Sequence, residues 1–169
     1  MEKLKSNIVL IGMPGCGKTT VGKVLAKKLN YKFCDMDLYI QQMTKKTIKE
    51  LFEPGEENFR DFETKACEEL AKLNNTIIAS GGGVVKREKN IEILKKNCTI
   101  LFIDRPVERI LNDVDINSRP LLKDGKEKLY SLYEERYELY KNAADIIILN
   151  KGYLRDTIDI IMDILNKKW

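Results

Sequence analysis

Short apolar runs alternate with helical patterns along the whole chain. Five of these runs predict β-strands, and polar or turn-forming stretches separate them from one another. Because the runs are apolar on both faces and alternate with helical stretches, they predict a parallel sheet flanked by helices, which is an α/β fold. The predicted strands are Asn7–Ile11, Tyr31–Cys34, Thr76–Ser80, Cys98–Ile103 and Asp145–Leu149.

Amphipathic periodicity predicts the helices that cover this five-stranded sheet. Thr19–Leu29 follows the first strand, and apolar residues recur every three or four positions across Glu56–Leu73 and from Leu154 to Leu165. One long irregular stretch remains at Asn112–Gly125, and loops of this length in compact domains are often lids. Because no linker or internal repeat divides the chain, we expect residues 1–169 to form one domain with a lid at about 112–125.

Composition argues against several classes of function. Hydrophobic residues make up 43% of the 169 positions and charged residues 33%, as in ordinary globular proteins. The net charge of +4 is spread over mixed Lys and Glu without a basic, aromatic-rich stripe, so we expect no nucleic-acid partner. No apolar run is long enough to span a bilayer and we find no export signal, so we expect no membrane partner and a cytoplasmic location.

The cysteine and histidine content limits which metal sites, disulfides and acid–base groups the chain can have. The four cysteines are widely spaced without a C-x-x-C pair, which argues against a zinc site or a disulfide scaffold. Cys34, Cys67 and Cys98 are expected to be small buried hydrophobes. The chain has no histidine, so any acid–base chemistry must use Asp, Glu, Lys or Tyr.

The first strand runs into the glycine-rich loop GMPGCGKT, residues 12–19. This loop matches G-x-x-x-x-G-K-[ST] between a strand and a helix, which is the context that a phosphate-binding loop requires. Glycines let backbone N–H groups turn toward phosphate oxygens, the lysine reaches the β- and γ-phosphates, and the threonine hydroxyl can ligate Mg²⁺. We therefore expect the loop to bind a nucleotide, with no side-chain role for the cysteine, through Gly12, Gly15, Cys16, Gly17, Lys18, Thr19 and Thr20.

A switch GTPase is an alternative that the sequence disfavours. NKGY at Asn150–Tyr153 resembles the guanine motif N-K-x-D, but a tyrosine stands where an aspartate should pair with the base, and no D-x-x-G motif is present. The strand ILFID ends at Asp104, which either caps the following helix or has a metal role.

A second candidate site follows the second strand. The motif DMD places Asp35 and Asp37 at the carboxyl end of that strand, where α/β proteins bind ligands. In an extended chain the two side chains would point the same way. One of them can then hold Mg²⁺ waters while the other faces an acceptor hydroxyl; the alternative is a pair of acids in a surface loop.

Six motifs in order along nearly the whole chain resemble those of the shikimate kinases, in the nucleoside-monophosphate-kinase group of P-loop proteins. The resemblance implies a P-loop NTPase fold with a lid. It also implies ATP- and Mg²⁺-dependent phosphorylation of the 3-hydroxyl of shikimate, a step of chorismate and aromatic amino-acid biosynthesis. The six motifs are GMPGCGKT, DMD, FRDFE, SGGG, RPLL and ERYELY.

The resemblance implies how the substrate is held. Arg60 and Glu63 stand three positions apart on one helix face and can pair. In the family such an arginine binds the substrate carboxylate, and the glutamate helps to hold the site. Arg136 corresponds to a second carboxylate-binding arginine, and the guanidinium fork suits a carboxylate. The bare backbone of Gly81, Gly82 and Gly83 lets the substrate come close.

Catalysis is expected from Lys18, Asp37 and Arg119. Arg119 of RPLL matches the lid arginine, which contacts the nucleotide and neutralises charge on the transferring phosphoryl group. Asp37 is expected to orient the 3-hydroxyl and take its proton. Asp35 is expected to hold water on the Mg²⁺ carried by Thr19.

Two departures from the family concern the adenine. Asn112 stands where the family often has an arginine against the base, with Arg109 one turn earlier as a substitute, and NKGYL lacks the family's proline. Another small-molecule kinase, such as a gluconate kinase, is the alternative function, and a nucleotide-binding regulator without transfer activity is the alternative class. The FRDFE helix and the RPLL lid favour shikimate. A site within one chain leads us to expect a monomer.

Overall fold

The computed structural model describes residues 4–113 and 125–168. In chain order its elements are β1 (Asn7–Ile11), α1 (Lys18–Leu29), β2 (Lys32–Asp35), α2 (Met36–Thr44), α3 (Ile48–Phe52), α4 (Glu56–Leu70), β3 (Thr76–Ala79), the 3₁₀ turn η1 (Val84–Lys86), α5 (Glu88–Lys95), β4 (Cys98–Asp104), α6 (Val107–Asp113), α7 (Lys126–Ala143), β5 (Ile146–Leu149) and α8 (Leu154–Lys168).

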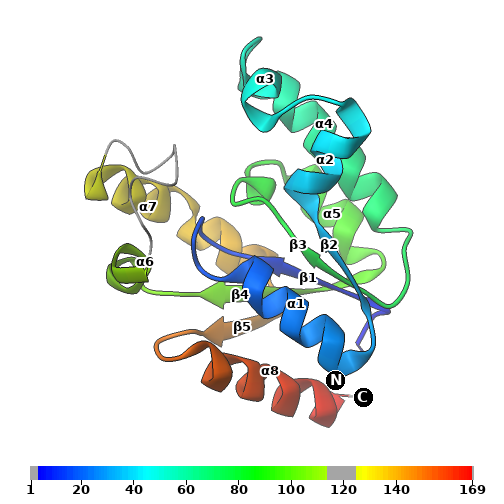
Figure 1. The fold of residues 1–169 in the computed structure, drawn as a ribbon, viewed down its shortest axis with the longest axis vertical. Helices are drawn as coiled ribbons and strands as arrows, with labels where there is room; N and C mark the ends of the chain where they lie inside the picture. The colour runs from blue at the N-terminus through cyan, green and yellow to red at the C-terminus, as the bar shows by residue number, and fades with distance from the viewer. Residues whose placement is uncertain (1–3, 114–124, 169) are drawn as a thin grey trace.

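The five strands form one parallel sheet in the order β2-β3-β1-β4-β5 (Figure 1). The first strand is central, with Val9 opposite Ile78 of β3 and Ile100 of β4. The chain fills one side of β1 before it crosses to the other side. The loop after β1 therefore emerges at a topological switch point, which is where open α/β sheets bind ligands.

Helices cover both faces of the sheet. On one face α1 packs against β3 and α8, whereas on the other face α5 and α7 pack against β4 and η1. Figure 1 shows α2, α3 and α4 rising as a group from the carboxyl end of β2. This arrangement leaves the carboxyl edge of the sheet between the α2–α4 group and α7.

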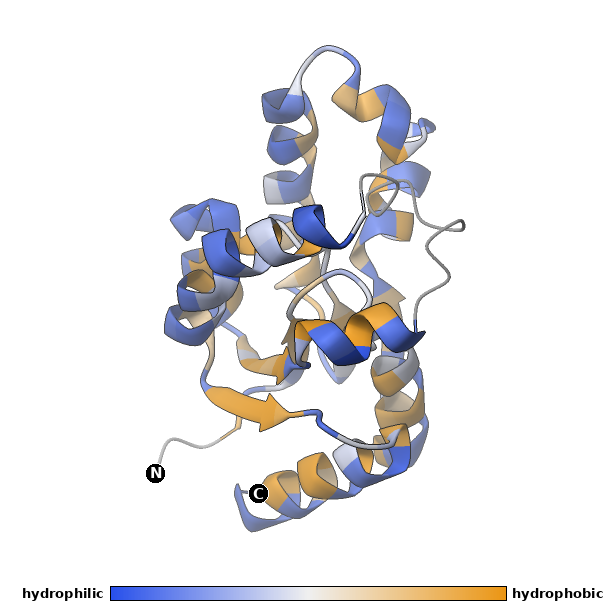
Figure 2. Cartoon of the chain, turned by 90° about the vertical axis from the view of Figure 1, so that its left-hand side faces the viewer, coloured by the Kyte–Doolittle hydropathy of each residue, from blue (hydrophilic) through white to orange (hydrophobic). Residues whose placement is uncertain are grey.

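The burial of the strands explains their apolar sequences. Every residue of β1, β3 and β4 is buried, as expected for strands covered on both faces, whereas the edge strands β2 and β5 are partly exposed. Figure 2 shows helices that are hydrophobic along one side and hydrophilic along the other. On the α7 side, the rings of Phe102 and Tyr140 stack with centroids 5.1 Å apart.

All five predicted strands are present, and each observed end lies within one residue of the predicted one. The helix predicted over Glu56–Leu73 ends earlier, at Leu70, because the chain turns toward β3 through Asn75, which has a φ of 52°. Among the described helices, none is both long and apolar enough to cross a membrane.

The prediction of an irregular stretch over Asn112–Gly125 is wrong at its start. Asn112 and Asp113 belong to α6, which is anchored by buried residues and by an ion pair between Arg105 and Asp113. The remaining part of the predicted lid, residues 114–124, lies outside the described residues.

Asn150 joins the end of the sheet to the glycine loop. It follows β5, is 3% exposed, and donates from its amide nitrogen to the carbonyl oxygen of Cys16 at 3.3 Å. Its Oδ1 accepts from the Thr157 hydroxyl at 2.7 Å and from the Arg105 guanidinium at 3.1 Å. One side chain therefore connects β5, α8, the segment after β4 and the loop after β1.

The variant Asn150→Ala is expected to lower the free energy of unfolding by about 1–3 kcal/mol, because it leaves buried hydrogen-bonding groups without their partner. Urea denaturation of the unliganded protein measures this loss. Asn142→Ala, at an exposed position of α7, is the matched control and is expected to stay within about 0.5 kcal/mol of the parent. If the two variants were equally stable, Asn150 would not have this structural role.

Candidate functional site

The loop between β1 and α1 has the backbone that its glycines predict. Gly12, Gly15 and Gly17 have φ angles of 148°, 80° and 100°, which side chains other than glycine rarely adopt. A Cβ on Gly12 would also lie 2.7 Å from the carbonyl oxygen of Ile103 on β4. The close approach of the loop to β4 therefore requires glycine at position 12.

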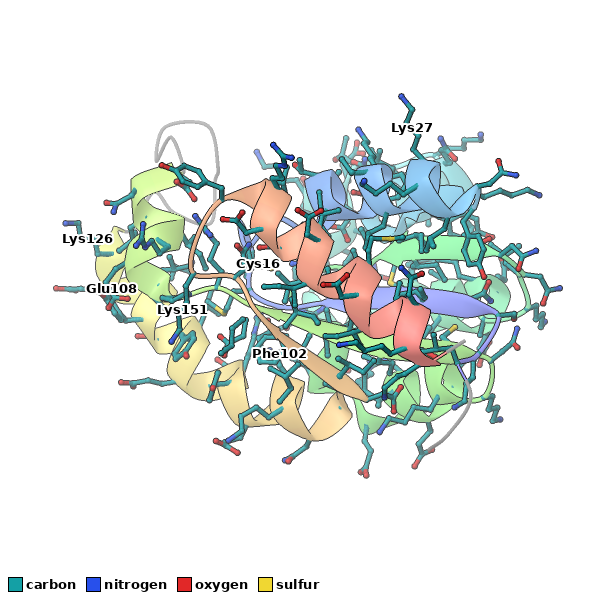
Figure 3. The ribbon with its side chains drawn as sticks, turned by 90° about the horizontal axis from the view of Figure 1, so that it is seen from below. Cys16, Lys27, Phe102, Glu108, Lys126 and Lys151 are labelled. Carbon is teal, nitrogen blue, oxygen red and sulfur yellow. The ribbon has the colours of Figure 1, made fainter. Side chains whose placement is uncertain are left out.

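Lys18 begins α1 and turns back into the loop. Its ammonium group donates to the carbonyl oxygens of Gly12 at 2.8 Å and Met13 at 2.9 Å, and the residue is 8% exposed. Cys16 is buried beside it, with Sγ 3.8 Å from the Lys18 ammonium nitrogen, and the backbone N–H of Cys16 donates to the Met13 carbonyl. Lys27, farther along α1, extends into solvent in Figure 3.

Thr19 and Asp35 lie together, as the sequence predicts. The Thr19 hydroxyl donates to Asp35 Oδ2 at 3.1 Å, while Asp35 Oδ1 accepts from the backbone N–H of Leu38 and caps α2. Among the described residues, no group of three or more Cys, Asp or Glu side chains could hold a metal. A hydroxyl and one carboxylate fit Mg²⁺, which keeps several waters and takes substrate phosphates as ligands.

The prediction that the DMD segment is extended is wrong. Asp35 ends β2, but Asp37 lies in the first turn of α2. The reason is local, because the Asp35 carboxylate caps the helix and Met36 is fully buried at its start. The turn separates the two acids, so that Asp35 faces Thr19 and Asp37 faces the glycines after β3.

A cavity of about 330 Å³ lies between α4, the glycines after β3 and α7. A Cβ on Gly81 would lie 2.9 Å from Asp37 Oδ1, and a Cβ on Gly83 would collide with the Arg60 guanidinium. These glycines therefore let charged side chains approach the backbone. The cavity brings together every predicted substrate-binding residue, namely Asp37, Arg60, Glu63, Gly81, Gly82, Gly83 and Arg136.

Three charged residues of this cavity, Arg60, Glu63 and Arg136, are buried and only partly paired. Arg60 and Glu63 are 6% and 1% exposed and form an ion pair of 2.8 Å between Nη1 and Oε1. Glu63 Oε2 and Arg136 Nε are buried without any hydrogen-bond partner among the described residues. Because buried polar atoms are nearly always hydrogen-bonded, these two atoms indicate a place where a polar ligand binds.

Burial also changes the acidity of the two carboxyl groups. It raises the pKa of Asp37, and the negative charge of Asp35 raises that pKa further, whereas Lys18 and Arg60 lower it. Burial likewise raises the pKa of Glu63 against the lowering effect of Arg60. A carboxyl group whose pKa lies nearer to neutrality is better matched to accepting a proton.

A second cavity, of about 360 Å³, opens on the other side of the glycine loop. Residues 15–17 of the loop and the predicted Thr20 of α1 form one wall, and Arg105, Asn150 and Tyr153 form part of the other. Asn150 and Tyr153 belong to NKGYL, the loop that the family resemblance sets beside the adenine. Sequence reasoning missed Arg105, for which the sequence gives no signal. Neither Arg109 nor Asn112 lines this cavity.

Asp104 ends β4, three positions before α6 begins at Val107, so it does not cap that helix, and a metal role for it stays a prediction. Its carboxylate accepts from the Tyr137 hydroxyl at 3.3 Å, and burial raises its pKa. It lines a cavity between α6 and α7 beside Glu108 and Lys151, which Figure 3 labels. Arg119, the expected lid arginine, lies outside the described residues.

Comparison with known proteins agrees with this geometry. The family model for shikimate kinase matches residues 14–166. A shikimate kinase of Clostridium beijerinckii is 56% identical over 162 residues, which cover 96% of both chains. The structure of a shikimate kinase from Acinetobacter baumannii in complex with shikimate is 35% identical, with a TM-score of 0.88, and covers 96% of this chain and 94% of its own.

The gluconate kinase alternative has weaker support. A gluconokinase from Sinorhizobium meliloti has a TM-score of 0.63 but only 15% identity, over 98% of this chain and 94% of its own, which shows a shared fold alone. The length and identity of the other matches are decisive: this chain belongs to the shikimate kinase family.

Proposed function

We propose that the cavity between α4 and α7 holds shikimate with its carboxylate between Arg60 and Arg136 and its acceptor hydroxyl at Asp37. As a family member, the protein transfers the γ-phosphoryl group of ATP to the 3-hydroxyl of shikimate in aromatic amino-acid biosynthesis. The observation that carries the placement is the buried Arg136 Nε, which has no hydrogen-bond partner within residues 4–113 and 125–168. A carboxylate offers the acceptors that this nitrogen lacks.

Asp37 is the group that orients the acceptor hydroxyl. It shares the cavity with Arg60 and lies close enough to Lys18 for that charge to lower its pKa. Phosphoryl transfer through a loose transition state needs positioning more than early deprotonation. Asp37 therefore holds the hydroxyl in line with the γ-phosphate and accepts its proton late in the transfer.

The remaining roles concern the phosphates. Lys18 balances charge on the β- and γ-phosphates, and the lid arginine Arg119 does so on the transferring group. Thr19 and Asp35, joined by a hydrogen bond, would hold Mg²⁺ directly or through its waters. When bound, the ion supplies positive charge to the phosphate oxygens.

The nucleotide base is assigned to the cavity that Tyr153 lines. Gly15, Gly17 and Thr20 of the phosphate loop form part of the same cavity, so a nucleotide bound by the loop places its base there. Tyr153 is 83% exposed, which leaves its ring free to stack on a base. The expected monomer, cytoplasmic location and absence of a nucleic-acid or membrane partner remain predictions.

Asp37→Asn is expected to lower kcat by about 10²–10⁴, the usual effect of losing a general base, with ATP and Mg²⁺ binding nearly intact. Asp35→Asn is the matched control, and it should instead raise the Mg²⁺ concentration needed for half-maximal rate. Titrating Mg²⁺ against rate for both variants measures this difference. If excess Mg²⁺ rescues Asp37→Asn rather than Asp35→Asn, the two assignments are reversed.

The same variant has an expected effect on stability in the unliganded protein. Because burial raises the pKa of Asp37, ionisation costs more in the folded state than in the unfolded state. The parent therefore loses stability as the pH rises through that raised pKa, and Asp37→Asn does not. Thermal unfolding should show the variant as more stable at neutral pH and equal to the parent below the ordinary pKa of 3.8. If the variant were less stable than the parent at neutral pH, the claim that ionised Asp37 destabilises the folded state would be wrong.

Arg136→Lys keeps the positive charge but loses the planar fork. We expect calorimetry to show shikimate binding weakened by at least about tenfold, as for a lost charged hydrogen bond, with ATP binding little changed. Equal losses for both ligands would mean that Arg136 supports the structure instead of the substrate.

Tyr153→Ala is expected to raise the KM for ATP by about tenfold, within the range measured for base–aromatic stacking, with the KM for shikimate unchanged. Tyr153→Phe keeps the ring and should behave as the parent does. Steady-state kinetics with each substrate varied in turn measures both values. An alanine variant with the parent KM for ATP would exclude stacking on Tyr153.

A further inference from the structure

Lys86 has no part in the roles assigned so far, although it lines the substrate cavity. It is the last residue of η1, three positions after Gly83. Its ammonium nitrogen lies 2.7 Å from Glu56 Oε1 of α4 and 3.8 Å from Glu135 Oε1 of α7. Lys86 therefore pairs with acids from both helices that carry the substrate-binding arginines.

Glu56 is directly bonded to one of those arginines. Its Oε1 accepts from Arg60 Nε at 3.1 Å and from Nη2 at 3.0 Å, and Glu63 takes Arg60 Nη1 at 2.8 Å. Two carboxylates thus already balance the single charge of Arg60. An arriving substrate carboxylate meets Glu56 as a like charge next to its intended partner.

The charge on Lys86 offsets that repulsion. Its hydrogen bond is the largest cause that holds the pKa of Glu56 below the ordinary value. On the α7 side, Glu135 Oε1 also lies 3.7 Å from Arg136 Nε. A continuous row of alternating charges therefore lines the cavity, from Arg60 through Glu56, Lys86 and Glu135 to Arg136.

We propose that Lys86 is a positioning residue for shikimate: it neutralises Glu56 beside Arg60, so that Arg60 and Arg136 present net positive charge to the substrate carboxylate. This inference rests on the proposed placement of that carboxylate between the two arginines.

The exposure of these groups argues that the row serves binding rather than folding. The side chains of Lys86, Glu56 and Glu135 are 30%, 43% and 50% exposed. Ion pairs this accessible to water contribute little to the free energy of unfolding. Their field still reaches a ligand a few ångströms away in a cavity that also holds the buried side chains of Arg60, Glu63 and Arg136. Loss of Lys86 should therefore weaken the binding of shikimate, while the melting temperature falls only slightly.

The test is a set of four variants assayed for kcat and for the KM of each substrate. Lys86→Met is expected to raise the KM for shikimate about five- to tenfold, the range for one partly screened charge, with kcat and the KM for ATP within about twofold of the parent. Lys86→Arg should restore the affinity. Lys89→Met, at an exposed position of α5, is the control for loss of surface charge and should not change the KM.

The double variant Lys86→Met/Glu56→Gln separates charge balance from direct contact. The glutamine side chain would still accept from Arg60 but carries no charge to be offset, so the KM for shikimate should return to within about twofold of the parent. If the double variant binds as weakly as Lys86→Met, Lys86 touches the substrate itself and the proposal fails. It fails equally if Lys86→Met leaves the KM unchanged, or lowers kcat and ATP affinity in step with a fall in melting temperature.

Arg136→Lys makes this failure distinguishable from failure of the substrate placement. If Arg136→Lys weakens shikimate binding and Lys86→Met does not, the role of Lys86 is wrong and the placement stands. If neither variant weakens shikimate binding, the carboxylate lies elsewhere and both ideas fail.

Discussion

The contact between the phosphate loop and β4 is the constraint on which the rest of the site depends. Because no Cβ fits between Gly12 and the Ile103 carbonyl, the loop turns directly at the end of the central strand and brings Lys18 back over it. Asn150 fixes the far side of the loop through the Cys16 carbonyl. The positions of both cavities follow, since each is walled on one side by this loop or by the proline within it.

Charge balance is the second constraint. The substrate cavity holds acids and arginines that water only partly reaches, and two of their atoms have no hydrogen-bond partner in the part of the unliganded chain that the structure describes. A buried donor without a partner and a carboxyl group with a raised pKa both disfavour folding, and both are suited to a bound substrate. The same burial that raises the pKa of Asp37 therefore prepares it to accept a proton. Burial of Asp37 therefore both lowers the stability of the unliganded protein and raises the pKa of the group that accepts the proton.

The sequence predicts the parts of this molecule that local pattern determines. Apolar runs locate the strands, and GMPGCGKT locates the phosphate loop, because strand burial and loop backbone depend on neighbouring residues. The prediction of an extended DMD segment fails because Asp35 can instead cap a helix. The burial of Met36, which the sequence does not reveal, favours the helix over the extended chain. The contacts of Lys86 with α4 and α7 depend on elements far apart in the chain, so no local pattern could reveal them. Arg119 remains a prediction from the family resemblance.

A crystal structure of the protein with shikimate and ADP tests the central claim most directly. The account predicts that the shikimate carboxylate lies within hydrogen-bonding distance of both Arg60 and Arg136, pairs with Arg136 Nε, and leaves the 3-hydroxyl on Asp37. A carboxylate bound instead at Lys18, or a different hydroxyl on Asp37 with Arg136 Nε still lacking a hydrogen bond, would contradict it.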